Sequence, residues 1–253
     1  MPASGQAPVS VVTLVAPTSI HLALGEPRDH DPSDDVIVDH GVFVVSYNPT
    51  KLVPNWVAWR LVAEDLGTVE RSNRFHADPM LPANMPSPRP RDYTRSGYDR
   101  GHMCPSGDRT ASPGANDETF VMTNMEPQAH ALNVGPWEGL EKFERDVARD
   151  GKQVFVVAGG VFDAAPVHLA GGEAVPRANF KIIIVLDQGA GASAVDATTT
   201  TYAVIMPNST TVSGTRWPEY QVSIDEVERQ SGYDFLTLVP EDIQRSLEAK
   251  IAH

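Results

Sequence analysis

The residues best suited to chemistry are His102, at the end of an Asp-Arg-Gly-His tetrapeptide, and Asn133, 31 residues further along the chain. Near pH 7 a neutral imidazole can accept a proton from a water molecule. The amide oxygen of Asn133 suits Mg²⁺, a cation that prefers oxygen ligands and keeps several of its own waters. Hydrolysis of a phosphodiester needs an activated water and stabilisation of the developing negative charge. These residues therefore favour metal-assisted phosphodiester hydrolysis, although Asn133 is also suited to cap the helix that follows it.

The charge distribution indicates a compact phosphate site. A formal net charge of −13 argues against extensive nucleic-acid contacts, because proteins bind the phosphate backbone largely through Lys and Arg. Residues 71–109, however, carry seven basic against four acidic residues, and all seven are arginine. A guanidinium group makes forked contacts to phosphate oxygens better than an ammonium group does. We therefore expect a local arginine-rich site and not a long electrostatic footprint.

Residues 79–113 differ in composition from the rest of the chain. They hold seven prolines and few periodic apolar positions, yet they lie between well-patterned elements. A long ordered loop inside a compact domain is usually functional. This stretch contains His102 and most of the arginines, so we expect it to form a functional loop held by the elements on either side.

Several short apolar runs predict the strands of a core sheet. Residues 36–47 are rich in Val and Phe with Gly41 in the middle, which indicates two strands or one bulged strand. Residues 55–63 alternate as a strand does. Three further β-branched runs have the length of buried strands, namely residues 153–158, 180–186 and 202–206.

Helical patterns are fewer and come later. Apolar residues recur at helical spacing after Pro136, until Asp150-Gly151 stops the pattern. Ser223 caps a short helix that Gly232 ends, and residues 240–252 are predicted to form a terminal amphipathic helix. Because strands and helices do not alternate regularly, we predict an α+β fold with a mixed, largely antiparallel sheet and flanking helices. No repeat or linker divides the chain, so residues 1–253 are predicted to be one domain, with residues 1–34 mostly irregular.

Other kinds of site find little support in the sequence. Cys104 invites a thiol-nucleophile interpretation, but nothing else supports an oxyanion site. There is no nucleophile elbow, Walker A sequence, zinc-protease motif or dinucleotide fingerprint. No apolar run approaches the ~18 to 20 residues that cross a bilayer, so no membrane partner is expected. Aromatic residues are not interleaved with lysines, which disfavours a module that only binds single strands.

The neighbours of the Asp-Arg-Gly-His tetrapeptide carry a family resemblance. The segments Thr123-Asn124-Met125-Glu126-Pro127-Gln128 and Leu132-Asn133, and then residues 137–141, follow it in order. Further matching motifs run nearly from end to end, at residues 21–25, 55–59, 156–160, 175–176, 180–181 and 232–236. In these motifs the chain resembles the DNA/RNA non-specific endonuclease family, which has a ββα-metal (His-Me finger) active site. The resemblance implies that same active-site unit here.

The resemblance also implies roles for the residues nearest the ion. In the family pattern His102 is the general base and Asn133 holds a hydrated Mg²⁺, for which Mn²⁺ or another divalent ion can substitute. Glu141 binds the ion through water, and Arg145 supports the phosphate. By spacing alone, Glu141 and Arg145 form an ordinary i,i+4 ion pair on one side of a helix.

Four more residues have more than one interpretation. Arg71 lies 31 residues before His102, where the family's phosphate-binding arginine is expected, although Arg74 is close enough to exchange with it. Arg100 could contact phosphate or buttress the loop from behind. Asn124 could orient His102 or a phosphate oxygen, or hold a turn. Asp99 is interpreted as an ionic brace for the loop or as the group that orients His102.

The expected function is metal-dependent, sequence-non-specific cleavage of DNA and RNA to products with 5′-phosphates, through backbone contacts. Two alternatives stay open: a catalytically silent nucleic-acid-binding relative, and a phosphodiesterase with a narrower substrate. The resemblance leaves monomer and homodimer open and allows a protein inhibitor as a partner. No signal is seen in the sequence, so a secreted or periplasmic location after processing is the expectation and an intracellular one the alternative.

Overall fold

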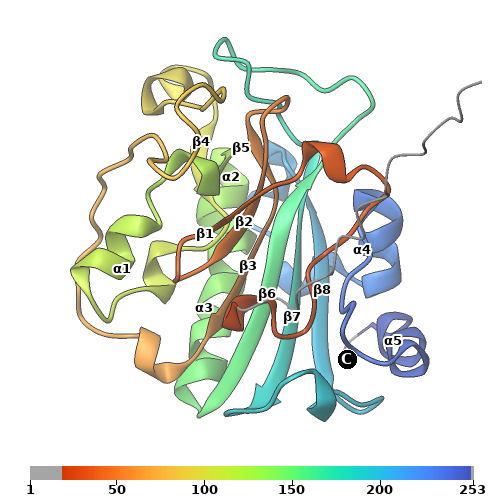
Figure 1. Cartoon of the computed structure of the whole chain (residues 1–253). Coiled ribbons are helices and arrows are strands. Elements are labelled where there is room, and N and C mark those ends of the chain that lie inside the picture. Colours follow the sequence, from red (N-terminus) through yellow and green to blue (C-terminus); the bar gives the residue numbers. More distant parts are fainter. Residues whose placement is uncertain (1–18, 252–253) are drawn as a thin grey trace, which may run out of the picture.

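A seven-stranded antiparallel sheet forms the centre of the molecule in the computed structural model, which describes residues 19–251 (Figure 1). In spatial order its strands are β1 (Val36–Asp39), β2 (Val44–Asn48), β3 (Val53–Leu61), β6 (Lys152–Val161), β7 (Ala178–Asp187), β8 (Thr200–Pro207) and β9 (Gln221–Val222). Every neighbouring pair is antiparallel. The predicted α+β class with a largely antiparallel sheet is therefore confirmed.

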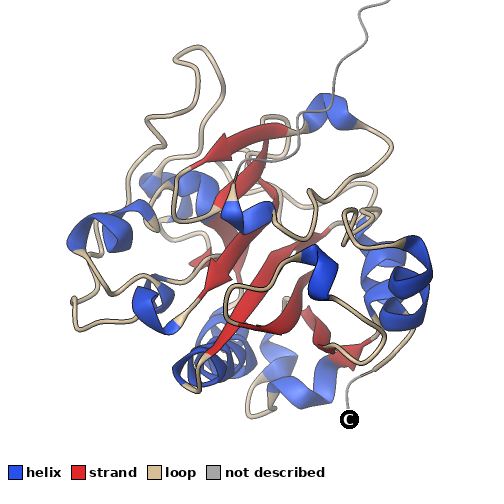
Figure 2. Ribbon diagram, turned by 60° about the horizontal axis from the view of Figure 1, so that its bottom comes forward, coloured by secondary structure: helices blue, strands red, loops and turns tan. Residues whose placement is uncertain are grey.

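Both faces of this sheet are buried. Trp56 of β3 packs in one apolar cluster, whereas Trp59 of the same strand packs in the cluster on the other side. Helix α3 (Glu138–Arg149) covers the Trp59 side, and α4 (Ile224–Ser231) and α5 (Glu241–Glu248) cover the Trp56 side (Figure 2). Burial on both faces explains why the strands appear in the sequence as nearly continuous apolar runs.

A second, two-stranded sheet lies beside the first and belongs to the active-site region. It consists of β4 (Asp99–His102) and β5 (Met125–Gln128), which pair antiparallel. In the sequence, the short helix α1 (Pro113–Glu118) lies between these two strands and α2 (His130–Leu132) follows β5. Residues 79–113 had been predicted as a loop. Strand β4 departs from that prediction because its pairing with β5 is long-range and gives no local periodicity.

Strands β1 to β3 and β6 to β8 and helices α3 to α5 agree with the sequence predictions except at their ends, whereas β5, β9, α1 and α2 are not among the predicted elements. Residues 36–47 form two strands, which settles the alternative left open there. Ser223 caps α4 by accepting from the backbone N–H of Glu226, and Gly232 ends it in the left-handed region with φ of 86°. Helix α5 ends at Glu248, earlier than predicted, because the chain turns and the Lys250 ammonium binds the carbonyl of Ala197.

The irregular N-terminal segment can be compared with the prediction only in part. Residues 1–18 lie outside the described residues, and so does Ala252 of the predicted terminal helix. Two single turns of 3₁₀-helix, Ile20–Leu22 and Pro32–Asp34, interrupt the rest of the segment. Within residues 19–251, no helix combines the length and apolar character needed to cross a bilayer.

Candidate active site

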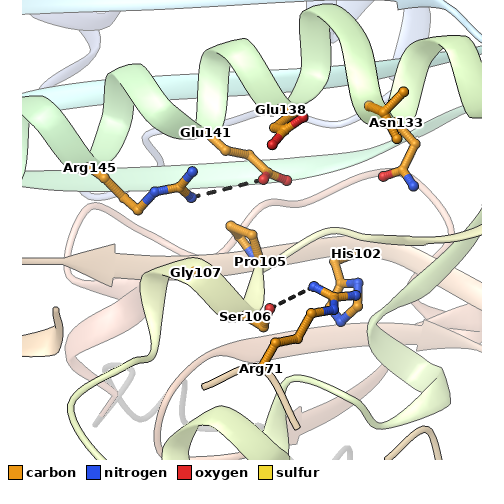
Figure 3. A pocket seen from close by; sticks show the side chains of 10 residues that line it. Arg71, His102, Pro105, Ser106, Gly107, Asn133, Glu138, Glu141 and Arg145 are labelled. Atoms are coloured by element: carbon orange, nitrogen blue, oxygen red, sulfur yellow. Dashed lines mark hydrogen bonds and ion pairs between the residues drawn. The ribbon is translucent and has the colours of Figure 1, made fainter. Parts of the chain in front are cut away.

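The β4–β5 hairpin places His102 at its end, opposite the start of α3 (Figure 3). His102 pairs with Met125, and Gly101 with Glu126. A Cβ atom at Gly101 would lie 2.5 Å from side-chain atoms of Gln128, so the close packing of the hairpin requires glycine here. From the helix side, Trp137 Nε1 donates a hydrogen bond of 3.3 Å to the His102 carbonyl. The hairpin and the helix are thereby joined next to the histidine.

A pocket of about 360 Å³ lies between the hairpin and α3. Figure 3 shows His102 and Arg71 on one side of it and Asn133, Glu141 and Arg145 on the other. Pro105, Ser106, Gly107, Val134 and Glu138 complete its lining. Five of the predicted site residues, which are spread over more than seventy positions of the sequence, therefore face one space.

His102 is nearly enclosed, with only 6% of its surface exposed. Its ring packs edge-on against Phe120, with 4.9 Å between the ring centroids. The buried Nε2 atom has no hydrogen-bond partner in the part of the chain that the structure describes. Burial, and then the positive charge of Arg71, lowers the pKa of His102 to about 3. The imidazole is therefore neutral at pH 7, the form that can accept a proton.

Arg71 is held rigidly beside His102. Its Nη1 donates to Ser106 Oγ at 2.7 Å, and its Nε donates to Asn73 Oδ1 at 2.8 Å. The guanidinium carbon lies 4.9 Å from the centroid of the Phe120 ring. A cation fixed in this way is preorganised for negative charge in the pocket.

Arg74, the alternative to Arg71, is placed differently. Its Nε pairs with Asp117 at 2.9 Å and its side chain is largely exposed. It does not contribute to the lining of the pocket. Of the two arginines, the geometry selects Arg71 as the one that can contact a bound phosphate.

Asn133 is oriented by Asp99. Its Nδ2 donates to Asp99 Oδ2 at 2.9 Å. Because an ionised carboxylate only accepts hydrogen bonds, the amide nitrogen must face Asp99, which leaves Oδ1 toward the pocket (Figure 3). His130 Nδ1 donates to the same Asp99 oxygen at 2.8 Å. Asp99 thus braces Asn133 and α2, and the alternative in which it orients His102 is wrong.

The backbone around Asn133 differs from the predicted helix cap. Residues Asn133–Trp137 form a wide π-type turn, interrupted by non-helical angles at Gly135. Helix α3 begins only at Glu138, and no side chain caps it. Asn133 therefore does not cap α3, because the turn separates the two. Irregular turns of this type are frequent at functional sites, where they aim a side chain.

Glu141 and Arg145 belong to a buried network and not to an ordinary surface pair. Arg145 Nη1 lies 3.9 Å from a Glu141 carboxylate oxygen and donates to Asp108 Oδ1 at 3.1 Å. The buried Asp108 carboxylate also accepts from Trp59 Nε1 at 3.0 Å. Burial raises the pKa of Glu141 to about 7, although Lys181 and Arg145 oppose the rise. The Glu141 carboxylate can therefore gain or lose a proton near neutral pH, or bind a cation in place of the proton.

Two residues predicted as catalytic do not reach the pocket. Asn124 is fully buried, and its amide bonds to the backbone of Cys104 and Thr119 on both its nitrogen and its oxygen. Arg100 donates from Nε and Nη2 to the Pro90 carbonyl. Neither residue lines the pocket, and these contacts engage the Asn124 amide and two of the Arg100 guanidinium nitrogens. The contacts agree with the structural alternatives, in which Asn124 holds a turn and Arg100 buttresses the loop from behind.

Cys104 is also outside the pocket. Its side chain is fully buried, and burial raises the pKa of the thiol. The geometry therefore does not support the interpretation of Cys104 as a thiol nucleophile.

Three contributors to the site were not foreseen in the sequence: Ser106, Phe120 and Asp108. Ser106 and Phe120 hold Arg71, and Asp108 holds Arg145. A lone serine, phenylalanine or aspartate carries no local signal of such a role. Only the nearness of Ser106 and Asp108 to His102 in the sequence could have drawn attention to them.

The pocket has the donors that a hard divalent cation requires. Asn133 offers an oriented amide oxygen, and Glu138 and Glu141 line the same side of the pocket. All three are oxygen donors, and a single protein amide with carboxylates and water is sufficient for Mg²⁺. Burial raises the pKa of Glu141, and a cation bound beside this carboxylate would favour its ionised form.

A two-stranded hairpin followed by a helix, with an imidazole at the end of its first strand, is the ββα arrangement that the sequence resemblance implied. The family model described as DNA/RNA non-specific endonuclease matches residues 26–242, and the chain belongs to this family. Membership supports endonuclease activity on nucleic acid.

Individual proteins that are similar to this chain are also named as nucleases. A nuclease of Nostoc sp. is 39% identical over 252 residues, covering 97% of this chain and 91% of that protein. Mitochondrial endonuclease G of Bos taurus is 30% identical, covering 81% of this chain and 69% of that protein. A crystal structure of the EndoG/EndoGI complex, concerned with the mechanism of EndoG inhibition, matches with a TM-score of 0.74 and 28% identity, covering 90% of this chain and 96% of that one.

Proposed function

We propose that this endonuclease depends on a divalent cation, with Mg²⁺ or Mn²⁺ as its ion, and that His102 is the general base. The observation that carries the proposal is one pocket that collects a neutral imidazole, a fixed guanidinium and an oriented amide oxygen. These groups match the needs of phosphodiester hydrolysis: a base, stabilisation of charge on phosphate, and ligands for a cation.

His102 would take a proton from the attacking water. Its place in the lining of the pocket and its neutral state at pH 7 support this role. A pKa of about 3 describes the pocket without substrate, where Arg71 is the neighbouring charge. A bound phosphodiester adds a negative charge beside the ring, which offsets Arg71 and raises the pKa of His102 toward the range where a base is effective.

Arg71 would neutralise the charge that grows on the phosphate oxygens. Its three contacts hold the guanidinium before substrate arrives, so little reorganisation is needed during the reaction. Arg145 would add positive charge from the α3 side. Its bond to the buried Asp108 fixes its position in the pocket.

Asn133 would hold the cation directly and Glu141 would hold it through a water molecule, with Glu138 beside them. A bound divalent cation would supply the charge that stabilises the departing 3′-oxygen, which leaves the phosphate on the 5′ side. Asp99 keeps the Asn133 oxygen turned toward the pocket, because it occupies the amide nitrogen.

The partners we propose are DNA and RNA, bound through their backbones, since the pocket residues are phosphate-directed and none is arranged to read a base. We propose one nuclease domain for residues 1–253, acting as a monomer or homodimer. The inhibitor complex of EndoG supports a protein inhibitor as a further partner. The mitochondrial relative favours an intracellular location, and no comparison supports the export expected from the sequence.

A plasmid-nicking assay tests the proposal. The parent protein is expected to cut plasmid and RNA with Mg²⁺ or Mn²⁺ and to stop when EDTA is added. His102→Ala should lower the rate at least ~10²-fold, a typical effect of losing a general base. His168→Ala is a matched control, because His168 is exposed and does not line the pocket. Products with 5′-phosphates should be rejoined by DNA ligase without prior phosphorylation.

Several outcomes would contradict this function. A His102→Ala protein that is folded by thermal unfolding and cuts as fast as the parent removes His102 from the chemistry. If the parent protein binds plasmid but cuts nothing with Mg²⁺ or Mn²⁺, it is the catalytically silent nucleic-acid-binding relative. A parent that hydrolyses only small phosphodiesters is the narrower phosphodiesterase.

A further inference from the structure

A second group of acidic side chains lies across the main sheet from the pocket, where α4 and α5 pack against each other (Figure 1). Asp225 and Glu228 are one helical turn apart on α4, and Glu248 is the last residue of α5. Each offers a carboxylate oxygen, and these three oxygens lie within 4.8 Å of one another. Three ionised carboxylates at such distances repel one another unless something positive lies between them.

No basic side chain of residues 19–251 provides this charge. Arg229 on α4 pairs with Glu226, and Arg245 on α5 pairs with Glu241. Among residues 19–251 the three carboxylates accept one hydrogen bond, from the backbone N–H of Phe235 to Glu228 Oε1 at 3.1 Å. The cluster is therefore left uncompensated although arginines are present on both helices.

Glu248 gives independent evidence that a ligand is missing. Only 5% of this residue is exposed, and its Oε1 is buried without a hydrogen-bond partner among the described residues. It also stands at the C-terminal end of α5, where the helix dipole disfavours a negative charge and favours a cation. An unpartnered carboxylate in this place is costly unless a cation binds it.

We propose that Asp225, Glu228 and Glu248 bind one divalent cation of the size of Ca²⁺, which joins α4 to α5. Oxygen ligands lie about 2.4 Å from Ca²⁺, so two ligands of one ion can be at most about 4.8 Å apart, and the three oxygens meet this limit. Waters can complete the coordination on the exposed side of Asp225. Mg²⁺ demands shorter and more regular ligand distances, whereas Ca²⁺ accepts the full range of oxygen separations that this limit allows.

The role of this ion would be structural. Val227 of α4 and Leu247 of α5 are buried in the apolar cluster on this side of the sheet. Glu228 and Glu248 follow these two residues in the sequence. Without an ion, electrostatic repulsion between their carboxylates would oppose the packing of α4 against α5. Ca²⁺ would replace this repulsion with a link between the helices, and folding would be coupled to binding.

Thermal unfolding and calorimetric titration with Ca²⁺ alone test this site. Both use the full chain with Asn133→Ala, which removes the ligand proposed for the active-site cation. We expect one Ca²⁺ bound per chain, and a rise in Tm of about 5 to 10 °C when Ca²⁺ is about 100-fold above its Kd. Adding EDTA should reverse the rise. Mg²⁺ at the same concentration should give a smaller rise.

Two substitutions separate this site from other effects. In the same background, Glu248→Gln should abolish the response to Ca²⁺ and, without Ca²⁺ at pH 8, should unfold at a temperature at least equal to that of the parent. Asp225→Asn, at an exposed position, should weaken Ca²⁺ binding at least tenfold. Asp242→Asn is the matched control, since it removes an exposed carboxylate from α5 outside the cluster and should leave the response unchanged.

The proposal is overturned if Ca²⁺ neither binds nor raises Tm, or if its effect survives both Glu248→Gln and Asp225→Asn. None of these measurements depends on nuclease activity, so the Ca²⁺ site and the proposed catalytic function can fail separately.

Discussion

At the active site, the position of Asn133 depends on a residue that does not itself line the pocket. Asp99 accepts one hydrogen bond from Asn133 and another from His130. Partners of this kind fix metal ligands, and their loss typically lowers metal affinity 10- to 100-fold. The orientation of the amide oxygen is therefore a property of the Asp99–Asn133 pair.

Replacing Asp99 should change the metal requirement more than the chemistry. For Asp99→Ala we expect the Mg²⁺ concentration that gives half-maximal plasmid cutting to rise about 10- to 100-fold, with a smaller loss of rate at saturating Mg²⁺. Asp99→Asn should lose less, because its amide oxygen can still accept from Asn133. His130→Ala is the control, since it removes the other hydrogen-bond donor to Asp99 and leaves the bond between Asp99 and Asn133. An unchanged Mg²⁺ titration for Asp99→Ala would refute this role.

Single residues differ in how far the sequence could predict them. His102 and Asn133 were found because imidazole and amide oxygen have intrinsic chemistry and stand in recognisable motifs. Arg71 could be preferred to Arg74 only on the resemblance, and contacts with Ser106 and Phe120 now distinguish it. Asn124 and Arg100 stand in or beside recognisable motifs, but a motif does not reveal that the Asn124 amide binds the backbone of Cys104 and Thr119 or that Arg100 donates to the Pro90 carbonyl.

At the scale of elements, α3 is attached to β7 by a buried ion pair. Lys181 Nζ lies 3.0 Å from Glu144 Oε1, and both side chains are fully buried. The ammonium also lies over the rings of Trp137 at 4.4 Å and Trp59 at 5.4 Å. Since Trp137 binds the His102 carbonyl, this contact supports the floor of the active site.

A double-mutant series can measure that contact. Lys181→Met should destabilise the protein by about 3 kcal/mol, because it leaves Glu144 buried without its partner. Adding Glu144→Leu should restore most of the loss, since an apolar pair of similar volume can replace a buried ion pair. Urea unfolding with an unchanged m-value provides the measurement. A double variant less stable than Lys181→Met alone would contradict the explanation.

A histidine ties the turn between β1 and β2 to α1. His40 Nε2 lies 3.1 Å from Asp78 Oδ2, and its Nδ1 lies 3.1 Å from Glu118 Oε2. Burial alone would lower the pKa of His40, but the two carboxylates outweigh it and raise the pKa. A group whose pKa is higher in the folded state stabilises the fold below its unfolded pKa of about 6.5, and this stabilisation is lost as pH rises through the folded pKa.

His40→Gln should therefore cost more stability at pH 6 than at pH 9. The measurement is the difference in free energy of unfolding between parent and variant at the two pH values, by urea titration. His168→Gln serves as control, because His168 is exposed. An equal cost of His40→Gln at both pH values would show that the charged form of His40 is not what holds the turn.

The helices and strands show where local sequence patterns are sufficient to predict secondary structure. Strands β1 to β3 and β6 to β8 and helix α4 are predicted because their periodicity, caps and end signals are local, whereas the two-residue strand β9 is too short for such a pattern. Strand β4 was not, since four residues with two charged side chains resemble a loop until Met125–Gln128 pairs with them. The π-type turn at Asn133–Trp137 likewise has no pattern of its own in the sequence.

For the whole molecule, the arginine-rich stretch is divided between residues that are internal or paired and the exposed Arg89, Arg91 and Arg95. Arg109 is buried and donates to the carbonyls of Val42 and Arg60, and Arg74 pairs with Asp117. Only Arg71 of the seven lines the pocket. With a net charge of −13, the molecule has few cations free to follow a nucleic-acid backbone.

Binding should therefore weaken only moderately with salt. For His102→Ala in EDTA, where no cutting is expected, we predict that log K against log salt has a slope shallower than about −5, the value for six phosphate contacts. Fluorescence anisotropy with a labelled duplex at 50 to 200 mM salt measures the slope. A slope near −9 would instead require an extended basic surface.

The buried position of Cys104 has a consequence for where such an enzyme can work. The chain has no second cysteine with which to form an internal disulfide, and the one thiol is shielded inside the core. Reductants then have no internal disulfide to break, and mild oxidants have no accessible thiol to attack. The fold and its pocket should accordingly tolerate oxidising and reducing surroundings equally well.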